Sequence, residues 1–300
     1  MPENIVRAIK QFYYLKTYSK RKIYTYRFDF MTSKLIQWHN IKIEGNLIAG
    51  KTIVFGHGFG TDQTAWQSVK TAFEKDYRII LYDNAGAGKL SAETFSSLKY
   101  SSLNGYSEDL ISILNAFNLT DVIMVAHSVS SMIALLAAIK KPEYFSRLIF
   151  IGASPRYLND ENYYGGFDQA QLDAMYENMR TNYYAWVSGF SAAAMGNPDK
   201  PELSHYFAST LSSIRPDIAL SVAKTIFESD IRKKLHAIKK PILLIQSQKD
   251  IAVPMQVARY LNENIRDSTL VTVNAEGHFP HISAPNEIIK AIKEFIFEDE

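Results

Sequence analysis

Ser128, Asp250 and His278 are residue types that together carry out nucleophilic acyl transfer, and they occur along the chain in that order. A serine hydroxyl becomes an effective nucleophile when a histidine removes its proton, and an acid fixes the tautomer of that histidine. Asp250 and His278 each follow a short apolar run, where parallel strands would end at one edge of a sheet. We therefore predict a catalytic triad with Ser128 as nucleophile, His278 as base and Asp250 as orienting acid.

The sequence around Ser128 fits a serine held on a sharp turn between a strand and a helix. Apolar residues at 122–126 precede it, and residues 131–140 have helical periodicity. Such a turn needs small residues two positions before and after the serine, and Ala126 and Ser130 occupy these positions. Glycine is more usual at both positions, so the motif by itself is a weak signal.

Two backbone N–H groups are candidates for stabilising an oxyanion. The N–H of Val129 lies at the start of the predicted helix, where the positive end of the helix dipole would face the reacting carbonyl. The N–H of Phe59 lies in a glycine-rich segment that follows an earlier strand. The alternative for that segment is an ordinary glycine turn.

Other titratable residues compete for these roles. His281 is the alternative base, while Asp83 also ends a strand but precedes the serine in the chain. We expect His127 and His57 to shape the pocket. The remaining histidines, expected on the surface or in a cap, are His39, His205 and His236. The histidines lack the spacing of a zinc-binding helix and no phosphate-binding loop occurs, so we expect no metal and no cofactor.

Short apolar runs alternate with helical patterns along most of the chain. The predicted strands cover residues 52–55, 78–83, 122–126, 148–151, 242–246 and 270–273. The predicted helices between and after them cover residues 66–73, 106–117, 131–140, 257–264 and 288–297. This alternation is typical of a parallel sheet covered on both faces. We predict an α/β-hydrolase fold, a mostly parallel doubly wound sheet with an inserted helical cap.

The alternation stops near Ser154 and resumes at Pro241. Helical patterns at 169–182 and 218–231 lie in this interval, so we predict a cap at 155–232. The core then consists of residues 31–154 and 233–300.

Residues 1–30 differ from the rest because they hold seven Lys and Arg side chains against Glu3 and Asp29. One hypothesis is that this basic extension is non-native, from an upstream start codon, or disordered. The alternative is a real surface arm or a targeting helix.

The composition is that of an ordinary globular protein, with 47% hydrophobic and 21% charged residues. No basic stripe continues the charge of residues 1–30, which argues against nucleic-acid binding. The chain has no cysteine, which suits a reducing compartment, and no apolar stretch of membrane-spanning length. We therefore expect a cytoplasmic protein.

Beyond these motifs, the chain strongly resembles the hydrolase family of the bacterial sigma-B energy-stress regulator RsbQ and the plant karrikin and strigolactone receptors. The resemblance extends from about residue 41 to the C-terminus. It is carried by Trp66 and by the segments 57–63, 127–130, 154–160, 164–167 and 215–222. Ser130 is similar to the karrikin-receptor branch, whereas Ala126 departs from the usual glycine.

The resemblance implies the same triad and the same oxyanion donors. It also implies that the cap has four helices, arranged in a V over a deep apolar cavity. The family's pocket positions fall on Tyr157, Trp186, Phe190, Ala194 and Phe227. The implied ligand is a small hydrophobic, butenolide-like ester or lactone. For any single aromatic residue, ordinary core packing is the alternative.

The resemblance further implies slow turnover within a signalling or stress-regulatory role. The implied regulatory partner is a stress phosphatase in the bacterial branch and a ubiquitin-ligase adaptor in the plant branch. The alternative function is a general carboxylesterase or a carbon–carbon bond hydrolase with no signalling partner.

Overall fold

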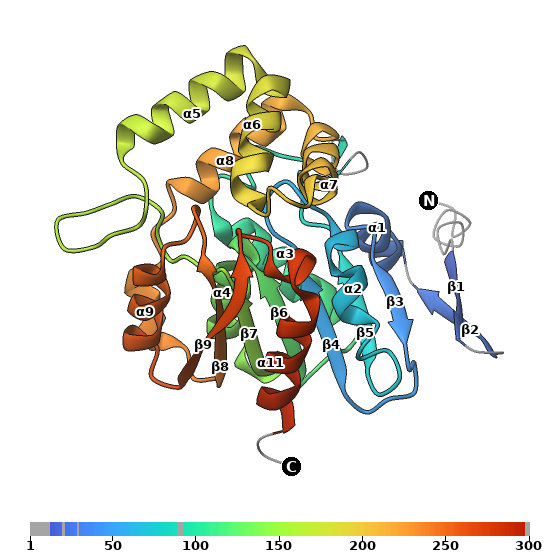
Figure 1. The fold of residues 1–300 in the computed structure, drawn as a ribbon. Coiled ribbons are helices and arrows are strands. Elements are labelled where there is room, and N and C mark those ends of the chain that lie inside the picture. Colours follow the sequence, from blue (N-terminus) through green and yellow to red (C-terminus); the bar gives the residue numbers. More distant parts are fainter. Residues whose placement is uncertain (1–12, 20–21, 29, 89–92, 298–300) are drawn as a thin grey trace, which may run out of the picture.

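A computed structural model describes residues 13–19, 22–28, 30–88 and 93–297. Within these residues the central sheet has seven strands in the order β3-β5-β4-β6-β7-β8-β9 (Figure 1). Their bounds are β3 Lys42–Gly45, β4 Thr52–Gly56, β5 Arg78–Tyr82, β6 Val122–His127, β7 Phe145–Ile151, β8 Ile242–Lys249 and β9 Ser268–Glu276. β3 is antiparallel to β5, and the remaining neighbours are parallel. The predicted fold class is confirmed.

Each predicted strand coincides with an observed one, but β3 was missed. It has only four residues and its side chains range from buried to exposed, so it lacks the continuous apolar run that marks the inner strands. The inner strand β4, in contrast, is buried along its whole length.

Helices cover both faces of the sheet. One face carries α3 Leu103–Ala116, α4 Val129–Lys140 and α9 Met255–Asn264, and the other carries α2 Gln67–Lys70 and α11 Pro285–Phe297. Alternate residues of a strand point to opposite faces, so Val54 packs in the first layer while Ile53 and Phe55 pack in the second. Most of the observed helices begin two or three residues before the predicted start, because the first turn of each observed helix has little apolar periodicity. The first predicted helix is shorter than expected, and α1 Phe30–Trp38 and α10 Pro280–Ser283 were not predicted.

Four helices occupy the interval between β7 and β8 and gather over one end of the sheet (Figure 1). They are α5 Gln169–Thr181, α6 Tyr183–Met195, α7 Pro201–Ser212 and α8 Pro216–Phe227. Local chemistry sets their ends: Asp168 and Gln171 form a capping box on α5, and Gly196 at φ +60° ends α6. We call these four helices the cap helices. The exact division of the chain into core and cap stays a prediction.

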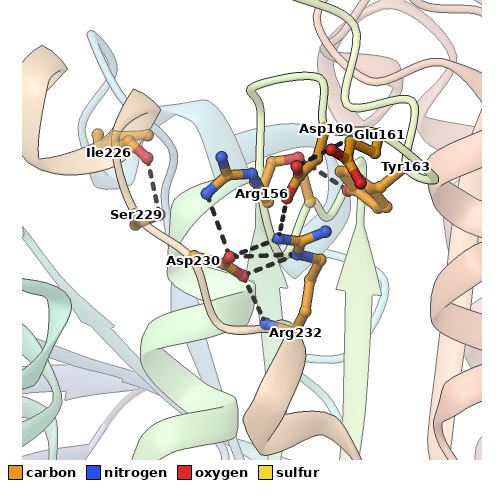
Figure 2. A network of polar contacts seen from close by, with 9 residues as sticks. Arg156, Asp160, Glu161, Tyr163, Ile226, Ser229, Asp230 and Arg232 are labelled. Carbon is orange, nitrogen blue, oxygen red and sulfur yellow. Dashed lines mark hydrogen bonds and ion pairs between the residues drawn. The ribbon is translucent and has the colours of Figure 1, made fainter.

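The chain enters and leaves the cap helices at two connections that lie side by side. Arg156 and Asp230 form an antiparallel bridge, and the Ile231 N–H donates to the Pro155 carbonyl at 2.8 Å. Figure 2 shows the side chains of Arg156, Asp230 and Arg232 converging between these connections. The two connections are therefore held together by backbone and side-chain contacts.

Before the core, β1 Tyr13–Ser19 and β2 Lys22–Phe28 form a separate two-stranded antiparallel sheet. This hairpin was not predicted, although both strands are rich in aromatic and β-branched residues. Residues 1–12, 20–21 and 29 lie outside the described residues. Whether residues 1–30 belong to the native protein stays a prediction.

In the part of the chain that the structure describes, every helix is too short or too polar to cross a lipid bilayer.

Candidate active site

Ser128 lies on the turn between β6 and α4, in a backbone conformation that residues other than glycine rarely adopt. Its φ is +56°, and its N–H donates to the Ile151 carbonyl of the neighbouring strand at 2.8 Å. Such a conformation costs about 1–3 kcal/mol and persists only where the surrounding structure imposes it. The flanking strand and helix impose it here, which fixes the position of the Ser128 hydroxyl.

The three side chains predicted as a triad form one line of hydrogen bonds. His278 Nε2 lies 2.9 Å from Ser128 Oγ, and His278 Nδ1 lies 2.8 Å from Asp250 Oδ2. Because the carboxylate can only accept, Nδ1 carries the proton and Nε2 is free to accept from the serine hydroxyl. All three side chains are largely buried. The arrangement can remove a proton from Ser128.

Asp250 is held by the loop that follows β8. Its Oδ1 accepts from the backbone N–H groups of Ala252 at 2.9 Å and Val253 at 3.0 Å. Its Oδ2 also accepts from Gln246 Nε2 at 3.2 Å. These bonds orient the carboxylate, so that one oxygen faces His278.

The C-terminal end of α6 packs against the loop that carries His278. The His278 N–H donates to the Ala194 carbonyl at 2.7 Å, so Ala194 meets the base through its backbone. Gly277, at φ +89°, lies so close to α6 that an added Cβ would be 1.9 Å from the Met195 carbonyl oxygen. Asn197 Nδ2 bridges the carbonyls of Met195 at 3.0 Å and Glu276 at 2.8 Å. A cap helix therefore positions the residue predicted as the base.

The segments that carry Phe59 and Val129 are tied together by side chains around the turn. Ser130 Oγ donates to the His57 carbonyl at 2.5 Å. Asn84 Nδ2 donates to the same carbonyl at 3.0 Å and to Ser130 Oγ at 2.9 Å. Sequence reasoning missed Asn84, although its place directly after β5 puts it at the same sheet edge as Ser128. Ser130 thus links the start of α4, where Val129 lies, to the loop that carries Phe59, and glycine has no side chain to make this link.

Three further histidines are buried around this site, and none takes the place of His278. His57 Nε2 accepts from the Asn84 N–H at 2.9 Å, and His127 Nε2 donates to the His278 carbonyl at 2.7 Å. The ring of His281, the alternative base, packs on Trp66 with 4.5 Å between centroids. Burial lowers the pKa of His281 to about 3 and that of His127 well below its ordinary value, so both rings are neutral.

The expectation for His39 was wrong. It is only 3% exposed, and its Nδ1 lies 3.0 Å from the Asp83 carbonyl oxygen. Asp83 itself accepts from the backbone N–H of Gln63 at 2.9 Å, and so supports the loop after β4. As expected, His205 lies exposed on α7 and His236 is exposed.

The predicted pocket aromatics form two pairs. Tyr157 packs edge-on against Phe227 of α8 at 4.9 Å, and Trp186 stacks on Phe190 within α6 at 4.9 Å. The Tyr157 hydroxyl lies 3.4 Å from Ser128 Oγ. Burial raises the pKa of Tyr157 to about 12, so the phenol keeps its proton. Tyr157 is thus the aromatic residue in contact with the Ser128 hydroxyl.

A small cavity lies against Phe59 and Val129. None of the five predicted pocket residues lines this cavity. The site therefore has two parts, an aromatic part at Tyr157 and a cavity of mixed lining, which includes Tyr106 and Ile226, beside the predicted oxyanion donors. Among the described residues, no group of three or more His, Cys, Asp or Glu side chains could hold a metal ion.

A family model described as the alpha/beta hydrolase fold matches residues 51–285. The karrikin insensitive 2 receptor CA of Petunia hybrida is 44% identical over 262 residues, which are 87% of this chain and 96% of that protein. A strigolactone esterase of Arabidopsis thaliana is 41% identical over 256 residues, 85% of this chain and 94% of that protein. The predicted resemblance to the karrikin and strigolactone receptors is confirmed.

A solved hydrolase structure has the same fold. A hydrolase from Oleispira antarctica superposes with a TM-score of 0.85 at 34% identity, over 88% of this chain and 97% of that protein. The roles of the individual site residues, the likeness to RsbQ and the cytoplasmic location stay predictions.

Proposed function

The chain belongs to the α/β-hydrolase fold family, and from this we propose that it is a serine hydrolase for a small hydrophobic, butenolide-like ester or lactone. The observation that carries the proposal is the hydrogen-bonded line from Ser128 through His278 to Asp250. The names of the relatives, receptors and esterases, support a hydrolase that works within signalling.

In the proposed reaction, Ser128 Oγ attacks the carbonyl carbon while its proton passes to His278 Nε2. Asp250 stabilises the imidazolium that forms. The N–H groups of Phe59 and Val129 donate to the oxyanion. His278 then gives its proton to the leaving oxygen as the bond between this oxygen and the carbonyl carbon breaks. The acyl group stays bound to Ser128 as an ester. Water, activated by His278, hydrolyses this ester and restores the serine.

The signalling part of the proposal is that ligand binding or slow turnover changes the cap helices, and that a partner protein recognises the change. The contact between Ala194 and His278 supports it, because a cap helix and the proposed base share a hydrogen bond. The alternative is a general carboxylesterase or a carbon–carbon bond hydrolase with the same triad and no partner.

The proposed nucleophile is tested by Ser128→Ala. We expect this variant to lose hydrolysis of p-nitrophenyl acetate and labelling by a fluorophosphonate probe, because Ser128 Oγ is the hydroxyl that bonds His278 Nε2 in the described part of the chain. Ser131→Ala is the matched control, since Ser131 lies in the first turn of α4, three residues after Ser128, and its hydroxyl donates to the Ala126 carbonyl. Labelling of Ser128→Ala at the wild-type rate would refute the assignment.

The ligand class is tested by thermal-shift measurements with a panel of lactones and butenolides. We expect stabilisation of both the wild type and Ser128→Ala, with product formed by the wild type alone. A panel that shifts neither protein contradicts the proposed ligand class but leaves the nucleophile assignment standing.

A further inference from the structure

His127 is the last residue of strand β6 and directly precedes Ser128. It is fully buried, and the proposed reaction leaves its ring without a role. The two ring nitrogens face two different loops of the site. One nitrogen meets the backbone of His278, and the other meets the backbone of Gly58.

The first nitrogen, Nε2, fixes the backbone of His278. It lies 2.7 Å from the His278 carbonyl oxygen, and because a carbonyl can only accept, Nε2 carries the proton. The N–H group of His278 donates to the Ala194 carbonyl at 2.7 Å. Both backbone polar groups of His278 are therefore bonded, one by the cap helix α6 and the other by His127.

The second nitrogen, Nδ1, packs against Gly58. Within the described residues this nitrogen has no hydrogen-bond partner, and in the neutral ring it carries no proton. A Cβ added to Gly58 would lie 2.4 Å from Nδ1. The φ of Gly58 is outside the left-handed region, so the close approach of His127 is what requires glycine at this position.

Gly58 and Phe59 share the peptide unit whose N–H is the proposed oxyanion donor. The Gly58 carbonyl accepts from His57 Nδ1 at 2.8 Å and from the Thr61 hydroxyl at 3.1 Å. The carbonyl and the N–H of a trans peptide point in opposite directions, so these two bonds set the direction of the Phe59 N–H. The ring of His127 packs beside the Cα of the same unit and limits how close it comes to Ser128.

We propose that His127 is a positioning residue that holds the proposed base and the proposed oxyanion donor in place on either side of Ser128. Its Nε2–H bonds the loop of His278, and its unprotonated edge supports Gly58. It acts through these two loops and not on the substrate. The inference rests on the proposed function, because both loops carry groups of the proposed reaction.

The contact with His278 is tested by kcat and KM for p-nitrophenyl acetate, measured with the full chain. His127→Phe keeps an aromatic ring but has no N–H donor, and its kcat should fall about tenfold or more, as for a misplaced catalytic group. Its KM should stay within about twofold of the wild type, since the lost interaction acts on the rate. His127→Gln has an N–H the same number of bonds from its Cα and should recover kcat to within about threefold of the wild type.

The contact with Gly58 is tested by a double-mutant cycle, which also serves if His127→Phe does not fold. Gly58→Ala places a Cβ against a rigid ring in the wild type but against a flexible side chain in His127→Gln. It should lower kcat about tenfold or more in the wild type and about threefold or less in His127→Gln. Equal losses in the two backgrounds would overturn the support of Gly58 by His127.

His281→Phe is the matched control. His281 is also fully buried and its ring packs on that of His127 at 4.3 Å, but its nitrogens bond no group of the site in the described residues. Its kcat should stay within about twofold of the wild type. Equal losses in His281→Phe and His127→Phe, or a failure of His127→Gln to recover kcat, would overturn the positioning role.

The outcomes separate the two proposals. Wild-type kcat in a folded His127→Phe, together with loss of activity in Ser128→Ala, would overturn the role of His127 and leave the serine hydrolase standing. Absence of both ester cleavage and fluorophosphonate labelling in the intact protein would overturn both.

Discussion

Ser130 shows how a departure from the usual glycine-rich turn is used in this molecule. Its hydroxyl donates to the His57 carbonyl and accepts from Asn84, so it joins the turn at Ser128 to the loop that carries Phe59. With glycine at this position, the His57 carbonyl would keep the hydrogen bond from Asn84 but would lose the one from the turn at Ser128. At the residue scale, the small side chain therefore meets a steric need and adds a contact.

His281 is the residue whose burial has the clearest consequence for stability. Both ring nitrogens are buried without a hydrogen-bond partner. Its pKa falls from an ordinary 6.5 to about 3, mainly by burial and then by the neighbouring His278 and His57. The unfolded chain therefore binds a proton between these values that the folded chain does not bind. The contribution of His281 to stability is therefore fully present above pH 6.5 and is lost as the pH falls from 6.5 toward 3.

We predict that His281→Phe makes stability less dependent on pH. Phenylalanine keeps the ring contact with Trp66 but cannot take up a proton. Between pH 7.5 and 5 the wild type should lose about 2 kcal/mol more unfolding free energy than the variant. Urea unfolding at both pH values measures this difference. His205→Gln, on the exposed face of α7, is the control, and an equal pH dependence in all three proteins would contradict the prediction.

At the scale of elements, the end of α6 and the His278 loop form one contact. Gly196 ends the helix, and Gly277 packs against the Met195 carbonyl. The Ala194 carbonyl then accepts from His278. The cap helix is in this way part of the frame that holds the proposed base.

We predict that Gly277→Ala lowers both stability and activity. A Cβ would lie 1.9 Å from the Met195 carbonyl oxygen, and φ at +89° disfavours alanine. The left-handed backbone alone costs about 1–3 kcal/mol, and relief of the clash must move α6 or His278. Esterase activity should fall by at least about tenfold, in line with a displaced catalytic group.

Thermal unfolding and p-nitrophenyl acetate turnover measure the two effects. Gly50→Ala is the control, because nothing lies within 4 Å of its added Cβ. Normal activity in Gly277→Ala would show that the α6 contact does not position His278.

At the scale of the whole molecule, the cap helices are joined to the sheet through two connections and an ionic network. Arg232 binds Asp230 at 2.7 Å and Asp160 at 2.8 Å, and Arg156 binds Asp230 at 3.1 Å (Figure 2). The Arg232 guanidinium also lies over the Tyr163 ring at 4.8 Å. Three short segments of chain are thus fixed to one another where the cap helices begin and end.

We predict that Asp230→Asn loosens this junction. Because the network is partly exposed, the loss should be about 1 kcal/mol of unfolding free energy, and it should shrink in 1 M salt. Limited proteolysis should cut the variant faster than the wild type between residues 155 and 232. Glu177→Gln, which breaks the exposed pair with Arg180, is the control and should change neither quantity. Unchanged proteolysis of Asp230→Asn would contradict the prediction.

The sequence by itself determined the inner strands, most of the helices and the order of Ser128, Asp250 and His278. These features are local, because the spacing of its own apolar residues indicates a buried strand or an amphipathic helix. The sequence did not predict the hairpin at residues 13–28 or the edge strand β3. Pairing with a neighbouring strand, rather than a long apolar run, defines both of them.

Only the tertiary structure decided which histidine meets Ser128. His278 and His281 are three residues apart, yet one bonds Ser128 Oγ and the other packs on Trp66. The structure also decided that the backbone carbonyl of Ala194 accepts a hydrogen bond from His278, and that Ile226 and Val222 line a cavity beside Phe59. Contacts between residues far apart in the chain depend on how the cap helices pack on the sheet, and the spacing of residues in the sequence does not specify that packing.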